Sequence, residues 1–109
     1  MNSPVIYKTN DKNQLHCEDG PAMIQADGSA YYYVNGALHR EDGPAIINSN
    51  GNVFWLINGQ PHRADGPSSI LSDGTVSYHL YGISYTKEEF EDAKAHRQNV
   101  RKLLTSAWV

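Results

Sequence analysis

The sequence predicts a mainly β fold, an antiparallel meander of three to four hairpin repeats with one C-terminal α-helix. Three observations lead to this prediction: a 23-residue repeat, turn dipeptides at two fixed places in each repeat, and a final segment without Gly or Pro. The apolar stretches between the turns are short, as is typical of strands. We expect a single domain over residues 1–109, a usual size for one hydrophobic core.

The repeat is visible as columns of similar residues 23 positions apart. Its clearest column is a histidine followed three residues later by Asp-Gly-Pro; these corner residues are His16, Asp19, His39, Asp42, His62 and Asp65. The full repeats cover residues 15–37, 38–60 and 61–83, and residues 5–14 form a partial copy. In the partial copy, Tyr7 is expected to stand in the aromatic column of Tyr32, Trp55 and Tyr78.

Each repeat is expected to run strand, turn, strand, turn. Asn50-Gly51 predicts a two-residue hairpin turn and Asn58-Gly59 a second turn, because Asn and Gly tolerate positive φ. Strand side chains alternate between two faces. The expected core face of the return strands holds Ala30, Val53, Val76, Tyr32, Trp55, Tyr78, Val34, Ile57 and Leu80. The opposite face carries Tyr31, Tyr33, Phe54 and Leu56.

Residues 86–104 predict one helix. Thr86 lies three residues before Glu89, which forms the capping-box pattern of a helix start. Helical spacing then relates the apolar residues Phe90, Ala93, Val100, Leu103 and Leu104. We expect this stripe to close the last edge or cover one face of the sheet, with Trp108 docking beside it.

Charge separates the repeats from the rest of the chain. Residues 15–83 carry two arginines against seven acidic residues, a net charge of −5, whereas the whole chain has −3. An acidic body repels phosphate backbones and suits a basic patch on a partner protein, so no nucleic-acid partner is expected. No apolar run approaches the roughly 18 residues of a membrane span, so no membrane partner is expected. The single cysteine, Cys17, excludes an internal disulfide and is consistent with the cytoplasm.

The repeat resembles the MORN family, in which a Tyr or Trp strand precedes an Asn-Gly turn and a histidine. The matching residues are Tyr32, Asn35, Gly36, His39, Trp55, Asn58, Gly59 and His62. After the histidine the chain departs from the Gly-x-Gly of the family, and its His-x-x-Asp-Gly-Pro-Ala form resembles repeats of small bacteriophage proteins. The resemblance implies a β-meander scaffold for binding and, for a phage protein, the host cell cytoplasm.

The corner histidines and aspartates invite a metal hypothesis, because imidazole and carboxylate both bind divalent ions. A repeat, however, spreads such groups along a line, and a metal needs three or four converging ligands. We therefore expect structural corners without a metal or cofactor, in which each Asp caps its own turn and each His bonds the neighbouring corner. Cys17 and His16 are adjacent and point to opposite faces, so we expect no catalytic residue and no enzyme.

Binding is the function that the sequence favours. Tyr31, Tyr33, Phe54 and Leu56 form the candidate surface, flanked by Arg40 and Arg63. Aromatic residues and arginine are enriched at interface centres. The same face would be a second core if the helix covered it. The sequence thus predicts a non-enzymatic protein-binding module, which we interpret as a phage-encoded inhibitor of a host protein. In one version of this hypothesis, the host protein serves in defence.

Two other functions stay open at this stage. In a small-ligand or nucleotide-binding sponge, aromatic rings would stack a base while Arg40 and Arg63 held phosphate. In a self-assembling structural protein, the outer strands of the meander would pair with another copy as a homo-oligomer.

Overall fold

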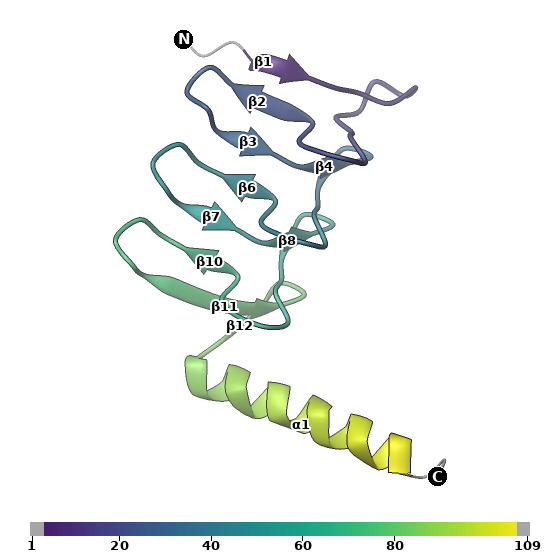
Figure 1. The fold of residues 1–109 in the computed structure, drawn as a ribbon, viewed down its shortest axis with the longest axis vertical. Coiled ribbons are helices and arrows are strands. Elements are labelled where there is room, and N and C mark those ends of the chain that lie inside the picture. The colour runs from purple at the N-terminus through teal and green to yellow at the C-terminus, as the bar shows by residue number, and fades with distance from the viewer. Residues whose placement is uncertain (1–3, 107–109) are drawn as a thin grey trace.

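The computed structural model describes residues 4–106, and it describes the side chains of residues 6–98. The fold is mainly β with antiparallel sheets and one C-terminal helix, which confirms the predicted fold class at that level (Figure 1). The elements are β1 (Pro4–Tyr7), β2 (Met23–Gln25), β3 (Ala30–Tyr31), β4 (Tyr33–Val34), β5 (Ala37–Leu38), β6 (Ile46–Ile47), β7 (Val53–Phe54), β8 (Leu56–Ile57), β9 (Gln60–Pro61), β10 (Ser69–Ile70), β11 (Val76–Leu80), β12 (Ile83–Tyr85) and α1 (Lys87–Ser106).

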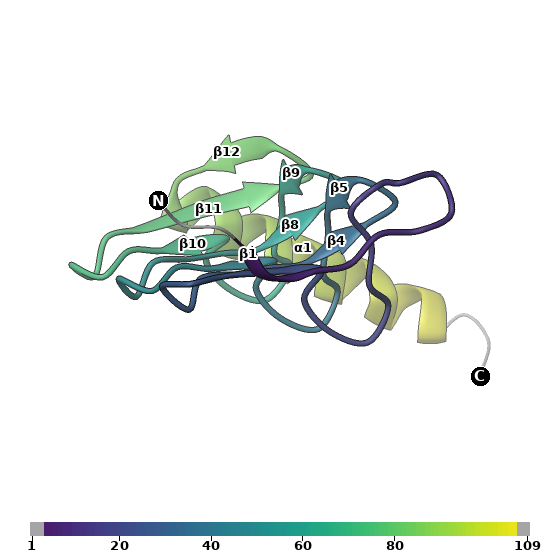
Figure 2. The ribbon, with the colours of Figure 1, turned by 90° about the horizontal axis from the view of Figure 1, so that it is seen from above.

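The main sheet has eight strands in the order β1-β2-β3-β6-β7-β10-β11-β12, and neighbouring strands are antiparallel. Its order follows the chain, so each hairpin lies beside the one before it. The pairs β4–β5 and β8–β9 form two small sheets beside it (Figure 2). The strands form a stack, and together with the C-terminal helix the molecule measures 55 × 36 × 19 Å.

The first two return strands bend in the middle, where a continuous strand was expected, whereas the third, β11, is continuous. β7 ends at Phe54 and β8 begins at Leu56, with Trp55 between them. The Trp55 N–H donates to the carbonyl of Ser68 at 2.7 Å, and its own carbonyl accepts from the His62 N–H at 3.0 Å. Because these two bonds go to different segments, the chain leaves the main sheet here. Tyr32 makes the same pair of bonds, to Ala45 and from His39.

The most tightly packed positions follow the Gly-Pro of each corner. Ala22, Ala45 and Ser68 are 0 %, 0 % and 1 % exposed. Small side chains fit there because the position lies opposite the bend of the neighbouring strand. The expected core face is confirmed at Leu80, which is buried, and wrong at Val76, which is 42 % exposed. β12 pairs with β11 only from Tyr78 to Leu80, so no strand of the described chain lies outside Val76.

The two kinds of turn differ in their backbone. Both residues of Asn35-Gly36, Asn58-Gly59 and Tyr81-Gly82 have positive φ. Tyr81 tolerates φ 47° while its ring stacks 4.0 Å from the His62 ring. The other turn is a three-residue loop, 49–51, closed by Asn48 and Asn52, so the predicted two-residue turn is wrong. Only Gly51 has positive φ there, and the Asn50 side chain accepts from the Asn52 N–H.

The partial copy is aligned one residue differently from the prediction. The Lys8 N–H donates to the Ala22 carbonyl at 2.7 Å, and the Lys8 carbonyl accepts from the His16 N–H at 3.0 Å. These are the bonds that Tyr32 and Trp55 make, so Lys8 stands in the aromatic column. Tyr7 pairs with Met23 in the neighbouring column, and its predicted position was wrong. A shift of one residue moves every side chain to the other face of a strand.

The C-terminal helix α1 closes the end of the stack. Its capping box is present, with the Thr86 N–H donating to Glu89 Oε1 at 2.8 Å and the Glu89 N–H to Thr86 Oγ1 at 3.1 Å. Phe90 is 1 % exposed and its ring lies 4.9 Å from that of Tyr78. α1 packs against β11 and β12, beyond the last hairpin, and does not extend along β3 to β8 (Figure 1).

Part of the predicted apolar stripe lies beyond the side chains that the structure describes. The side chains of Val100, Leu103 and Leu104, and all of Trp108, lie outside the described residues. Within residues 4–106, no helix combines the length and the apolar character that crossing a membrane requires.

Candidate functional site

The corner histidines fasten one hairpin to the next. His16 Nδ1 accepts from the Asn35 N–H at 3.0 Å and His39 Nδ1 from the Asn58 N–H at 3.0 Å, and His62 bonds Tyr81 in the same way at 2.9 Å. The partner is therefore a left-handed turn 19 residues further along, and the predicted bond to the neighbouring corner was wrong. The N–H of the first turn residue points away from its own hairpin, which leaves it accessible to the imidazole.

The second and third corners are closed by arginine. Arg40 Nε donates to Asp42 Oδ1 at 3.1 Å and Arg63 Nε to Asp65 Oδ1 at 3.0 Å. Each Nη1 also donates to a proline carbonyl, that of Pro44 or Pro67, at 3.2 Å. The prediction that these aspartates cap their own turns was wrong, because a guanidinium is a stronger donor than a backbone amide.

Each of these guanidinium groups is held between an aromatic ring and a glycine. Arg40 Cζ lies 4.0 Å from the centre of the Tyr32 ring, and Arg63 Cζ lies 4.0 Å from that of Trp55. A Cβ on Gly43 would come within 2.8 Å of the Arg40 guanidinium carbon. Arg40 and Arg63 thus contact the Tyr32 column, whereas the sequence placed them beside Tyr31 and Phe54.

The first corner has a different set of residues. Cys17 stands where the other corners have arginine, and its thiol donates to Asp19 Oδ1 at 3.2 Å. A Cβ on Gly20 would meet nothing within 4 Å, and Lys8 replaces the aromatic ring. The pKa of Asp19 is lowered by the Cys17 hydrogen bond, then by the N–H of Asp19 itself and by the charge of Lys8.

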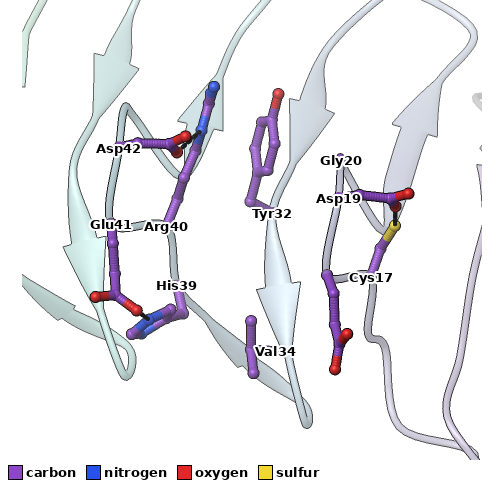
Figure 3. Close-up of a pocket in the computed structure, with 10 residues that line it drawn as sticks. Cys17, Asp19, Gly20, Tyr32, Val34, His39, Arg40, Glu41 and Asp42 are labelled. Carbon is purple, nitrogen blue, oxygen red and sulfur yellow. Dashed lines mark hydrogen bonds and ion pairs between the residues drawn. The ribbon is translucent and has the colours of Figure 1, made fainter.

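Two grooves lie between successive corners. The first has a volume of about 450 Å³ and has Tyr32 and Val34 between its two corners (Figure 3). The second has about 800 Å³, and Trp55 and Ile57 occupy the same places in it. The carboxylates on the corners that border the two grooves are Glu18, Asp19, Glu41, Asp42 and Asp65. These grooves were not predicted, although the recurrence of acidic residues at the corners was a signal for them.

The predicted aromatic surface lies on the other side of the strands. Tyr31, Tyr33, Phe54 and Leu56 are all half-buried. Tyr31 and Phe54 both pair with Ile46, so they lie in one row across the sheet. Burial raises the pKa of Tyr33, with smaller contributions from the charges of Tyr31 and Tyr7.

Tyr7 extends this surface. It is 61 % exposed and shares Met23 with Tyr31 as a cross-strand partner, which puts the two tyrosines in the same row. Sequence reasoning missed it because the partial copy was aligned one residue out. We call Tyr7, Tyr31, Tyr33, Phe54 and Leu56 the aromatic surface.

Among the described side chains, no three His, Cys, Asp or Glu residues converge as a metal site would require. Comparisons with protein-family models, with curated proteins and with solved structures found no match. The resemblance to the MORN family therefore rests on the repeated residues alone.

Proposed function

We propose that the protein is a non-enzymatic binding module that engages a partner protein through the aromatic surface. One observation carries the proposal: α1 packs at the end of the stack, against β11 and β12, and leaves the aromatic surface on β1 to β8 uncovered by the helix. Tyr is one of the residue types on which interface energy concentrates, and Phe is enriched at interfaces. In this proposal the meander consists of three to four hairpin repeats that act as a stiff scaffold.

The proposed partner is a bacterial host protein, and binding inhibits it. Support for this comes from the likeness of the His-x-x-Asp-Gly-Pro corners to repeats of small phage proteins. The host cytoplasm is the compartment that goes with this role.

A pull-down from bacterial lysate, read by mass spectrometry, tests the proposal. Tyr31→Ser and Phe54→Ser together copy Ser77, the residue of the same column in the third hairpin, so the double variant should fold. One host protein is expected with the wild type and should be absent with the double variant. Ile83→Ser is the matched control, because Ile83 is 62 % exposed in β12 and lies outside the aromatic surface. Retention of the partner by the folded double variant would contradict the proposal.

A nucleotide-binding role is the second candidate, because Arg40, Arg63 and Trp55 all line the second groove. Both guanidinium groups are already bound to Asp42 and Asp65, and Glu41 adds negative charge, so the groove disfavours phosphate. A thermal-shift panel of nucleotides should therefore be flat. A stabilisation that Arg63→Ala abolishes would favour this candidate.

A further inference from the structure

The corners form an edge with unbalanced negative charge. The side chains of Glu18, Glu41, Asp42 and Asp65 are each at least 80 % exposed. Asp42 and Asp65 are paired with arginine, whereas Glu18 and Glu41 lie 3.7 and 3.4 Å from a histidine Nε2. Glu18 and Asp19 thus have no arginine in their corner, and the one arginine beside Glu41 is bound to Asp42.

The first groove is the more acidic of the two. It is lined by four carboxylates and one arginine, whereas the second is lined by three carboxylates and two arginines. The difference comes from Cys17, which takes the place of a third arginine, and from Ala64, which takes the place of a glutamate at the third corner. Lys8 is the other cation near the corner that contains Cys17, and its side chain is exposed on the side of that corner toward β1. A cationic side chain should therefore be attracted most strongly to the first groove.

The chain itself shows how such a side chain is held at these corners. Arg40 and Arg63 stack on aromatic rings while a carboxylate and a proline carbonyl accept their N–H groups. An incoming arginine would find exposed carboxylates in each groove, together with an aromatic ring of which one face is already covered by the chain's own arginine. Stacking together with bidentate hydrogen bonds favours arginine over lysine.

The distance between the two grooves sets the distance between the two arginines of a segment that occupies both. Neighbouring corners are two strands apart, which is about 9.5 Å for strands separated by about 4.8 Å. An extended polyproline II segment advances about 9.3 Å in three residues and returns to the same face. Arginines at positions i and i+3 of such a segment therefore match two adjacent grooves.

We propose that the corner edge binds an extended basic segment of a partner protein, with arginines three residues apart seated in the two grooves. This site goes beyond the aromatic surface and uses different residues. Either proposal can therefore fail while the other stands.

The probe is a blocked peptide with the core Arg-Pro-Pro-Arg, titrated into the full chain at low salt and followed by amide NMR shifts. Resonances of Gly20, Asp19 and Gly43 should move. The peptide should bind about tenfold more tightly than a Pro-Arg-Arg-Pro peptide, because only the first spans both grooves. A citrulline version should not bind measurably. Equal affinity of the two arginine spacings, or no shift at the corners, would overturn the proposal.

Two variants with the same change in charge locate the site. Cys17→Arg restores the arginine of the other corners and should weaken peptide binding about fivefold by adding a cation to the first groove. Asp73→Asn copies Asn50 in a distant turn and should change the affinity by less than about twofold. Equal weakening by both variants would show that only net charge matters and would overturn the site. The Tyr31→Ser/Phe54→Ser variant should bind the peptide as the wild type does, and loss of binding there would also overturn it.

Discussion

The first corner and the two that follow it turn the chain in the same way but are held by different side chains. At residues 40–44 and 63–67, an arginine is packed between an aromatic ring and a glycine and bonds an aspartate. At residues 17–21, a cysteine bonds the aspartate, the ring is replaced by Lys8, and the space beside Gly20 is open. All three corners keep the same histidine bond to the next turn.

The comparison teaches that arginine and ring act as a unit. Where Lys8 takes the place of the ring, Cys17 takes the place of the arginine, because two cations stacked on each other would repel. The histidine and the Gly-Pro bend define the path of the chain, and the arginine with its ring adds stability to it. The first corner lies beside β1, the outer strand of the sheet, and has neither the arginine nor the ring.

The largest effect should come from removing a ring. Trp55→Ala deletes the surface on which Arg63 stacks and empties part of the second groove, so we expect a loss of about 3 kcal/mol in the free energy of unfolding. Lys8→Ala, the matched change at the first corner, should cost less than about 0.5 kcal/mol. Urea unfolding measures both. Similar losses at the two positions would contradict the idea that the ring supports the corner.

An added methyl group should have opposite effects on stability at the second corner, where the glycine contacts Arg40, and at the first corner, where the space beside the glycine is open. Gly43→Ala pushes the Arg40 guanidinium off Tyr32, so we expect a loss of about 1–2 kcal/mol. Gly20→Ala meets no atom and reduces the entropy of the unfolded chain, so a gain of about 0.5 kcal/mol is expected. Chemical denaturation of the pair provides the measurement. Equal changes would mean that the two corners are packed alike.

Acid should weaken the third corner through His62. Burial, and then the charge of Arg97, lower the pKa of His62 from 6.5. As the pH falls, His62 therefore takes up a proton in the unfolded chain before it does so in the folded chain. The stability that neutral His62 contributes above pH 6.5 is lost as the pH falls through the pKa of the folded state. His62→Asn keeps an acceptor near the position of Nδ1 and removes the titration. Thermal melts from pH 8 downward should show a smaller decline for the variant, and an unchanged decline would refute this origin.

The smallest expected effect is a coupling at the first corner. Lys8→Tyr should be close to neutral for stability and Cys17→Arg slightly destabilising, because its guanidinium would meet Lys8; together they should recreate the stacked arginine with a coupling energy of about 1 kcal/mol. A double-mutant cycle measured by urea unfolding gives this number. Strict additivity of the two changes would show that ring and arginine do not form a unit.

The elements that sequence analysis predicted well depend on local rules. Asn35-Gly36 and Asn58-Gly59 require left-handed backbone, and Thr86 with Glu89 satisfies the first N–H groups of the helix. Where prediction failed, several partners competed for the same group, some close in sequence and others 19 residues away. Asp42 could accept from its own backbone or from Arg40, and only the packed ring of Tyr32 brings the guanidinium within reach.

The sequence alone determined the β class, the left-handed Asn-Gly turns and the helix start, because propensity, positive φ and capping act over a few residues. Only the tertiary structure decided where the helix packs, which ring each arginine stacks on, and that Lys8 rather than Tyr7 stands in the aromatic column. Those features depend on strand register and on contacts between separate hairpins. A one-residue shift in register leaves the composition of the segment unchanged while it exchanges the two faces of the sheet.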